Sequence, residues 1–432
     1  MTAVPSANVR TCGRRRREDD GFPMDETSMP AVGEAARTAR CGGAAALAQA
    51  LQDARRDTLA MFAAYERALE GLVVPQREEL NPPLWELGHI GWFQEFWLSR
   101  NPQRGLGVDA DPDAPRPAGL RAEADALYHS SRVPHASRWS LPLPDAHATR
   151  ADLAVQLDRT LGLLERAGPG DDELYFFRLA LLHEDMHHEA ALYMARALGV
   201  RIGDPRWQPE PLPDAPPALR FEPGTWNLGS AAGAGFAFDN ELHAHPVSLG
   251  ATEIDAQAVR WAEYLPFVEA GGYSDERFWE ADGCRWLAAS GRTAPLHLRR
   301  TGGGWQRSLD GEWTALDLRE AACHLTLHEA RAWCRWAGRR LPQEAEWERA
   351  AVARPDAFRW GDVWEWTASP FTPYPGFRAH PYRDYSAPWF DGRPVLRGAS
   401  FMTQPRVRHP RYRNYFLAYR NDVPAGFRSC AP

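Results

Sequence analysis

Residues 206–219 (RWQPEPLPDAPPAL) divide the chain into two halves that follow different sequence patterns. This stretch holds five prolines and has neither a helical nor a strand period, so it predicts a stiff, extended linker. Before it, apolar residues recur at spacings of three and four; after it, short apolar runs are broken by Gly, Pro, Asp and Asn. We therefore expect an α+β chain whose two halves fold as separate domains.

The half before the linker predicts a helix bundle. Apolar periodicity marks four long segments, at residues 44–65, 84–98, 151–166 and 175–198. Four such helices favour a four-helix bundle over residues 41–205. Residues 1–40 are rich in Arg, Asp, Pro, Gly and Ala and nearly lack large apolar side chains, so we expect a disordered leader there.

The half after the linker, residues 220–432, predicts a mixed and loop-rich domain. It contains most of the 18 tryptophans of the chain. Helical patterns are confined to residues 326–337 and 343–352, the second of which follows Pro342. We expect aromatic packing, rather than long regular elements, to hold this domain together.

Charge and hydropathy exclude two classes of partner. The net charge is −7 and the pI about 6.1, so the chain lacks the broad positive field that non-specific nucleic-acid binding requires. The mean hydropathy is −0.50, and no apolar run approaches the roughly 18 to 20 residues of a membrane span. No apolar stretch follows the arginines at residues 14–17 to serve as a signal-peptide core, so we expect a cytoplasmic location.

The sharpest local signal is the segment HEDMHHE at residues 183–189, inside the fourth helical segment. A spacing of four places His183 and His187 one above the other on the same helix face, where two imidazoles can bind one cation. His188 lies about 100° around the helix and is expected to face another element or solvent. The alternative is a polar helix face that happens to contain histidines.

The same residues also match the H-E-x-x-H motif of zinc peptidases, in which Glu184 would act as general base. The extension found in one large group of these enzymes is missing, because Ala190 and Tyr193 stand where it needs Gly and His. A third ligand from downstream could come only from Glu210 or Glu222. A zinc peptidase therefore stays open as an alternative from another reaction class.

A better candidate for the third ligand lies upstream. His89 stands in the aromatic segment LWELGHIGWF, which belongs to another helix of the same expected bundle. Facing helices of a bundle can project ligands inward to one metal. The alternative reading of His89 is a histidine packed in the core.

Two bundle segments, LWELGHIGWFQEFW and LLHEDMHHE, precede a series of motifs in the second half, among them FEPGTWNLGS, FVEAGGY, RRLPQEAEWERAA, GDVWEWTASPFTPYPGF and VLRGASF. In this order they resemble the hercynine-oxygenating sulfoxide synthases of ergothioneine biosynthesis over roughly residues 45–432. The resemblance implies a DinB-like four-helix bundle joined to a domain of the formylglycine-generating (sulfatase-modifying) type, which is C-type-lectin-like.

The resemblance also implies a site. In the family, the residues that match His89, His183 and His187 hold a non-heme Fe(II), with open positions left for O2 and for a donor sulfur or selenium. A tyrosine on the loop after the E-W-T segment supplies a proton near the metal, and the matching residue here is Tyr374.

Several positions depart from the ergothioneine pattern. Met186 replaces a Gln, Phe377 replaces a second loop tyrosine, and Tyr415 and Phe416 replace a Trp-Asp pair. In the family that Asp and nearby arginines hold a zwitterionic thiol donor, and only Arg420 of this arrangement is kept here. The departures favour a neutral donor.

Together with the segment LYHSSRVPHASRWSLPLPD, these departures resemble the selenoneine synthase subgroup, which joins a selenosugar to hercynine. Arg132 and Arg138 in this segment are candidates to bind the donor or the hercynine carboxylate. Tyr415 and Phe416 are candidates to line a site for the trimethylammonium group.

The prediction from the sequence is thus an Fe(II)- and O2-dependent enzyme that forms a C–Se bond at the imidazole C2 of hercynine. The first alternative is C–S bond formation with cysteine or γ-glutamylcysteine. A formylglycine-generating activity needs a reactive cysteine pair, and Cys323 and Cys334 flank an expected core helix instead. A binding module without catalytic activity is the remaining class.

Overall fold

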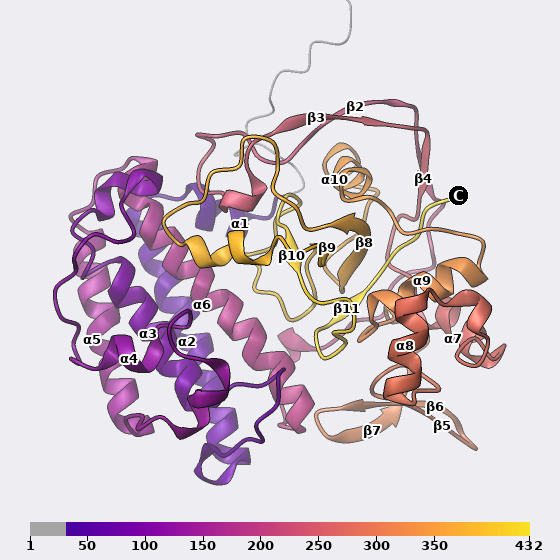
Figure 1. Cartoon of the computed structure of the whole chain (residues 1–432), viewed down its shortest axis with the longest axis horizontal. Coiled ribbons are helices and arrows are strands. Elements are labelled where there is room, and N and C mark those ends of the chain that lie inside the picture. The colour runs from indigo at the N-terminus through magenta and orange to yellow at the C-terminus, as the bar shows by residue number, and fades with distance from the viewer. Residues whose placement is uncertain (1–31) are drawn as a thin grey trace, which may run out of the picture.

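The computed structural model describes residues 32–432, and its α+β fold confirms the expected class. Figure 1 shows a helical N-terminal region, in indigo to magenta, beside a mixed domain in red to yellow. Most of the expected leader lies outside the described residues. Its last part was predicted wrongly, because Glu34–Cys41 form helix α1, whose Ala36 and Ala39 are fully buried.

Four long helices form the bundle, and local sequence explains their ends. They are α2 (Ala44–Ala68), α3 (Pro83–Trp97), α5 (Ala146–Leu164) and α6 (Asp171–Leu198). Asp145 accepts a hydrogen bond from the Ala148 amide and so caps α5, while Gly199 ends α6 in the left-handed region that suits glycine. Helix α3 is apolar nearly all round and lies buried between the others.

Shorter elements connect the bundle helices and lead into the second domain. They are η2 (Glu70–Leu72), η3 (Arg104–Asp109), α4 (Ala124–Tyr128), η4 (His135–Ser140) and η5 (Pro205–Trp207). Helix η5 lies at the start of the expected linker, and the first strand begins at Leu219. The domain boundaries at residues 205 and 220 stay predictions.

The second domain is built on a four-stranded sheet with the order β10-β9-β8-β11, in which only β8 and β11 are parallel. Three small antiparallel sheets surround it. The strands are β1 (Leu219–Phe221), β2 (Gly224–Leu228), β3 (His245–Leu249), β4 (Thr252–Ile254), β5 (Leu298–Thr301), β6 (Gly304–Leu309), β7 (Glu312–Ala315), β8 (Trp364–Pro370), β9 (Pro394–Gly398), β10 (Asn414–Tyr415) and β11 (Ala425–Gly426).

Helices cover this sheet and begin where capping residues occur. Thr326 with Glu329, and Gln343 with Glu346, form reciprocal caps on α9 (Leu327–Trp336) and α10 (Glu344–Ala353). The other helical elements of the domain are η6 (Asp239–Glu241), α7 (Trp261–Glu269), η7 (Glu276–Phe278), α8 (Ala281–Ser290), η8 (Arg383–Tyr385) and η9 (Ala387–Trp389).

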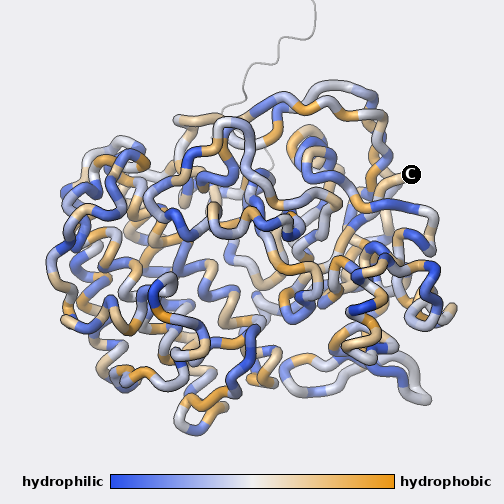
Figure 2. Tube along the Cα trace, in the orientation of Figure 1, coloured by the Kyte–Doolittle hydropathy of each residue, from blue (hydrophilic) through white to orange (hydrophobic). Residues whose placement is uncertain are grey.

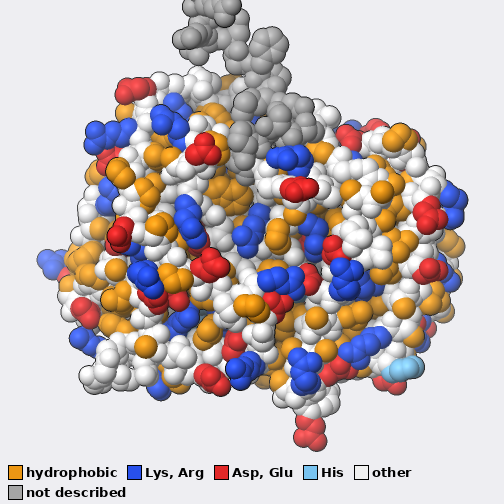
Figure 3. All heavy atoms as spheres, turned by 180° about the vertical axis from the view of Figure 1, so that it is seen from behind, with side chains coloured by type: hydrophobic (Ala, Val, Ile, Leu, Met, Phe, Trp, Pro, Cys, Tyr) orange, Lys and Arg blue, Asp and Glu red, His pale blue; other side chains and the backbone are white. Residues whose placement is uncertain are grey.

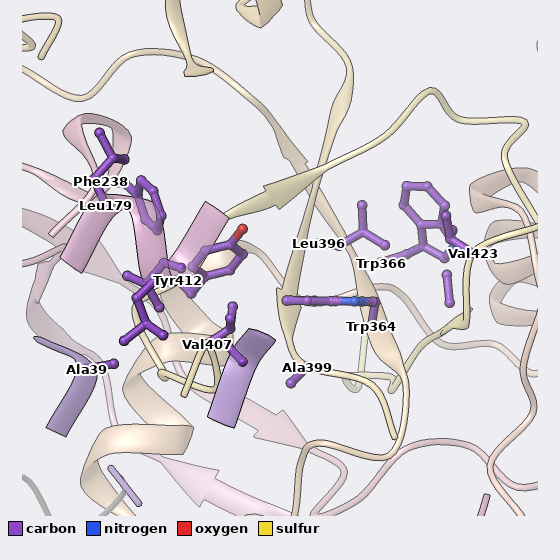
Figure 4. Packing of buried hydrophobic residues seen from close by; sticks show 14 of the residues in the cluster. Ala39, Leu179, Phe238, Trp364, Trp366, Leu396, Ala399, Val407, Tyr412 and Val423 are labelled. Atoms are coloured by element: carbon purple, nitrogen blue, oxygen red, sulfur yellow. The ribbon is translucent and has the colours of Figure 1, made fainter. Parts of the chain in front are cut away.

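Aromatic side chains fill the core of the second domain and continue into the bundle. Figure 4 shows Trp364 and Trp366 of β8 beside Leu396 of β9, with Tyr412 turned toward Phe238. The same cluster of buried residues includes many side chains of α3 and α6. Along the trace in Figure 2, hydrophobic and hydrophilic residues alternate over short distances in both halves.

Helix α6 joins the two halves through buried polar contacts. Asp185 accepts two hydrogen bonds from Arg406, at 2.8 and 2.7 Å. The Glu189 carboxylate accepts hydrogen bonds from Trp364 Nε1, Ser400 Oγ and Thr403 Oγ1, at 2.7 to 2.8 Å. Because unpaired buried polar groups are costly, these contacts fix the bundle on the domain.

The surface carries side chains of both charges (Figure 3). On the face shown in Figure 3, basic and acidic side chains intermingle among apolar ones. Among the described residues, no helix is long and apolar enough to cross a membrane.

We expect Glu189→Ala to lower the free energy of unfolding by about 3 kcal/mol, because the indole and two hydroxyl donors would lose their buried acceptor. Denaturant unfolding measures this change. Glu165→Ala on the exposed end of α5 is the control and should change stability by less than about 0.5 kcal/mol. Equal effects of the two substitutions would contradict the role given to Glu189.

Candidate metal centre

Three histidines from two helices meet inside the bundle. His89 belongs to α3, and His183 and His187 stand one turn apart on α6. One ligand nitrogen from each residue lies within 4.8 Å of the other two, as in a site that can hold a metal ion. The Nε2 atoms of His183 and His187 are 3.2 Å apart, so these two nitrogens face the same point.

Neighbouring acceptors select the nitrogen that two of the three imidazoles offer. Nδ1 of His89 lies 2.8 Å from the main-chain oxygen of Tyr128, and Nδ1 of His187 lies 2.5 Å from Oε2 of Glu86. A carbonyl or carboxylate can only accept, so both Nδ1 atoms must donate, and Nε2 keeps its lone pair. Such partners are typical of histidines that bind metals.

Burial keeps the imidazoles of His89 and His183 in the neutral form that metals require. It lowers the pKa of His89 to about 3 and that of His183 well below its ordinary value. Burial alone would raise the pKa of Glu86, but the charge and hydrogen bond of His187 outweigh it and hold that pKa low. An ionised Glu86 therefore accepts the hydrogen bond from His187.

Aromatic rings enclose the three histidines. Phe93 stacks on His183 with ring centroids 3.5 Å apart, and Trp85 stacks on His89 at 4.8 Å. Tyr382, from the loop before η8, packs edge-on against Phe93 at 4.9 Å and lies 6.1 Å from the His183 ring. The second domain thus supplies one wall of the site.

The loop that carries Tyr382 is tied to the bundle by surface contacts. Ser131 donates a hydrogen bond of 2.5 Å to Asp384, and Arg383 pairs with Asp113 at 2.9 Å. Both members of the second pair are more than half exposed, so this contact adds little to stability.

Met186 and Arg138, two of the predicted substrate contacts, lie close to the triad. Met186 directly precedes His187 on α6, and the hydroxyls of Tyr385 and Tyr412 reach its sulfur at 3.7 and 3.2 Å. The Arg138 guanidinium lies 3.8 Å from the ring centroid of Trp85, and the Trp85 ring also stacks on His89.

Arg132 is exposed, whereas Arg138 also donates a hydrogen bond to Asn81 at 2.8 Å. Of the two arginines, Arg138 is thus the one placed beside the triad, through Trp85. Substrate binding by either arginine stays a prediction.

Tyr374 does not have the surroundings predicted for a catalytic tyrosine. Its hydroxyl donates to Glu344 at 3.2 Å, and the Arg413 guanidinium lies 3.9 Å from its ring centroid. Burial raises its pKa well above the ordinary value. Tyr374 lies on the loop after β8, where the sequence motif places it. The tyrosine in ring contact with His183, however, is Tyr382, eight positions further on.

Among the remaining predicted substrate contacts, Tyr415 is linked to the site, whereas the ring contact of Phe377 lies elsewhere. Phe377 packs edge-on against Phe390 at 5.0 Å, away from the contacts of the triad. The Tyr415 hydroxyl donates to the main-chain oxygen of Tyr385, which in turn contacts Met186. Tyr415 is therefore linked to the site through one residue.

Phe416 and Arg420 lie together, with the guanidinium 5.4 Å from the ring centroid. Arg420 is held by two hydrogen bonds to Asp422, at 2.5 and 2.6 Å. This ion pair neutralises the charge that, in the family pattern, would help to hold a zwitterionic donor.

Glu184 cannot act as the general base of a zinc peptidase in this arrangement. It is buried and receives hydrogen bonds from Arg55 of α2, at 2.8 and 3.2 Å. An ion pair with arginine occupies both carboxylate oxygens. The geometry therefore counts against the peptidase alternative.

The cysteines also lack the surroundings of a reactive pair. Cys334 is buried in the main core, whereas Cys323 packs against other clusters. Burial raises the pKa of Cys323 to about 12. Two thiols in this state do not offer the thiolates of a copper-dependent formylglycine-generating site.

The sequence reasoning missed three residues of the site. Glu86 stands three positions before His89, so their shared helix face was a signal for a supporting carboxylate. Phe93 stands four positions after His89, so the same helix face was a signal for an aromatic neighbour of the site. Tyr382 lies in the segment PYRDYS, which also matches the family, but only the tertiary fold shows that this loop reaches the bundle.

We expect His89→Ala, His183→Ala and His187→Ala each to abolish stoichiometric metal binding, because two imidazoles hold a divalent ion far less tightly than three. Metal analysis after anaerobic reconstitution measures the loss. His188→Ala is the control on the same helix, since His188 faces Gln404 and Trp207 instead. Full metal content in any of the three triad variants would refute the assignment.

Comparison with known proteins agrees with this architecture. Residues 205–360 match the family model of the sulfatase-modifying factor enzyme 1-like domain. A hercynine oxygenase of Mycolicibacterium smegmatis is 32% identical over 81% of this chain and 90% of its own length. The hercynine oxygenase of Mycobacterium tuberculosis is 31% identical, again over 81% of this chain and 90% of the relative.

A second kind of relative matches only the C-terminal part of the architecture. The formylglycine-generating enzyme of Streptomyces coelicolor is 32% identical over 38% of this chain and 58% of its own length. The hercynine oxygenases, by contrast, match nearly their whole length. The chain is therefore an enzyme that belongs to the hercynine oxygenase family.

Proposed function

We propose that this enzyme uses a non-heme Fe(II) and O2 to join selenium from a selenosugar to the imidazole C2 carbon of hercynine. The observation that carries the proposal is the convergence of three imidazoles, from His89, His183 and His187, inside the bundle. The names of the relatives support hercynine as the substrate.

The donor set fits iron. Imidazole nitrogen is a ligand that Fe(II) accepts readily, and three ligands leave further coordination positions open. Bound Fe(II) would provide the redox chemistry with O2. Protein side chains cannot carry out this chemistry alone. Glu86 and the Tyr128 carbonyl would orient two of the ligands and strengthen them as bases.

The walls of the site fit a cationic imidazole betaine. The rings of Tyr382, Tyr385 and Tyr412 lie beside His183 and Met186, and aromatic faces attract a trimethylammonium group. The Arg138 guanidinium lies over Trp85, which stacks on His89, and a guanidinium can bind a carboxylate. We propose that these side chains hold hercynine.

The state of Arg420 supports a neutral donor. Asp422 already occupies its guanidinium, so a second carboxylate would have to displace an ion pair. The surface groove beside Arg420 carries side chains of both charges, and within it the Tyr419 hydroxyl donates to Glu78 at 2.9 Å. A selenosugar carries no carboxylate and would not need to displace the ion pair of Arg420 with Asp422.

We propose that Tyr382, and not Tyr374, provides the proton near the metal. Among the described residues, Tyr382 is the tyrosine whose ring contacts both His183 and Phe93. Burial raises its pKa, so the hydroxyl keeps its proton until a reacting group takes it.

The direct test supplies the anaerobic Fe(II)-loaded enzyme with O2, hercynine and one donor at a time, and identifies the product by mass spectrometry. We expect a hercynine–selenosugar adduct. A thiol adduct with cysteine or γ-glutamylcysteine, but none with the selenosugar, would assign the enzyme to sulfur chemistry. Peptide hydrolysis without O2 uptake would refute an oxygenase.

We expect Tyr382→Phe to lower the rate of bond formation about 100-fold with metal content unchanged, because the proton donor is lost while the ring remains. Oxidation should be diverted toward the donor alone, which product analysis would detect. Tyr374→Phe is the matched comparison and should keep the wild-type product ratio. The reverse pattern would restore the role to Tyr374.

A further inference from the structure

A small pocket lies behind the His187–Glu86 pair, between α2, α3 and α6. Most of its wall consists of buried apolar side chains from all three helices. They include Met61, Phe62, Leu87, Ile90 and Met194. His187 and Glu86 complete the lining, so the pocket touches a proposed metal ligand directly.

The polar groups in the wall are largely engaged elsewhere. The Tyr65 hydroxyl donates to the main-chain oxygen of Ala191 at 2.6 Å, and Glu86 accepts from His187. His188 Nδ1 lies 3.3 Å from Gln404. Within the described part of the chain, the Thr58 hydroxyl is the buried polar group of this wall that lacks a hydrogen-bond partner.

This lining disfavours water and suits an apolar guest. A buried water typically makes about three hydrogen bonds, and cavities lined by apolar side chains stay dry and bind small apolar molecules. One free hydroxyl cannot supply those bonds. The pocket offers about 30 Å³ to the centre of a water-sized molecule, which suits one diatomic gas molecule and excludes either organic substrate.

We infer that this pocket binds dioxygen beside the metal centre. O2 is small and apolar, so it partitions from water into apolar space, and His187 separates the pocket from the point where the three imidazoles meet. The inference rests on the proposed O2-dependent function. It assigns the gas an approach through the bundle, distinct from the side of the triad that Tyr382 covers.

Xenon is the probe, because it occupies apolar gas sites and is visible in a crystal. We expect one xenon atom in this pocket of the Fe(II)-loaded enzyme under xenon pressure. Ala191→Leu, which places an isobutyl group in the wall, should remove it. Ala154→Leu on the exposed face of α5 is the matched control and should keep xenon bound. An ordered water bonded to Thr58, or an empty pocket, would overturn the inference.

Kinetics give a second readout. Ala191→Leu should raise the KM for O2 several-fold while the KM for hercynine and the metal content stay at wild-type values. Ile90→Phe fills the same space from α3 and serves if Ala191→Leu fails to fold. An unchanged KM for O2 in a variant that has lost xenon would refute the role in O2 supply. Xenon binding does not depend on turnover, so a failure of the proposed reaction is recognised separately.

Discussion

Helix α6 is the element on which the architecture depends, because its 28 residues carry both metal-ligand candidates and the buried contacts to the second domain. One face presents His183 and His187 to α3, while another presents Asp185 and Glu189 to the second domain. The helical period separates these faces without any break in the helix. A shift of α6 would therefore disturb the imidazoles and the domain contact together, and the buried hydrogen bonds of Glu189 oppose such a shift.

Buried charged side chains in the second domain form arginine–glutamate ion pairs. Arg397 with Glu348, and Arg428 with Glu365, lie in the interior with their side chains at most 1% exposed. Removing one partner of such a pair leaves an uncompensated charge, which costs about 3 to 5 kcal/mol. The domain has few long elements, so these pairs and the aromatic core fix loops that hydrogen-bonded ladders do not reach. Tyr382 is carried on one such loop.

The sequence predicted the parts of the site that follow a local period. The spacing of His183 and His187 placed both on one face of a helix, and the bundle brought His89 to them. The metal identity and the roles of these residues stay proposals. Residues on irregular loops could not be placed in this way, because neither Tyr374 nor Tyr382 belongs to a periodic segment. Only the tertiary fold shows that the loop of Tyr382 lies against α3 and α6.

The same limit applies to charge. The sequence shows that Arg420 is present, but only the structure shows that Asp422 occupies it. Likewise, the H-E-x-x-H pattern alone suggests that Glu184 is a free base. The structure shows that Arg55 donates hydrogen bonds to both of its carboxylate oxygens. Pairing of this kind depends on contacts between distant segments, which no local pattern encodes.

The wall that carries Tyr382 and Tyr385 comes from a surface loop, whereas the imidazoles come from the rigid centre of the bundle. Changes in that loop can alter which molecule fits without loosening the ligands. Substitutions in that loop would therefore reshape one wall of the site while the helices that carry the three histidines keep their own packing.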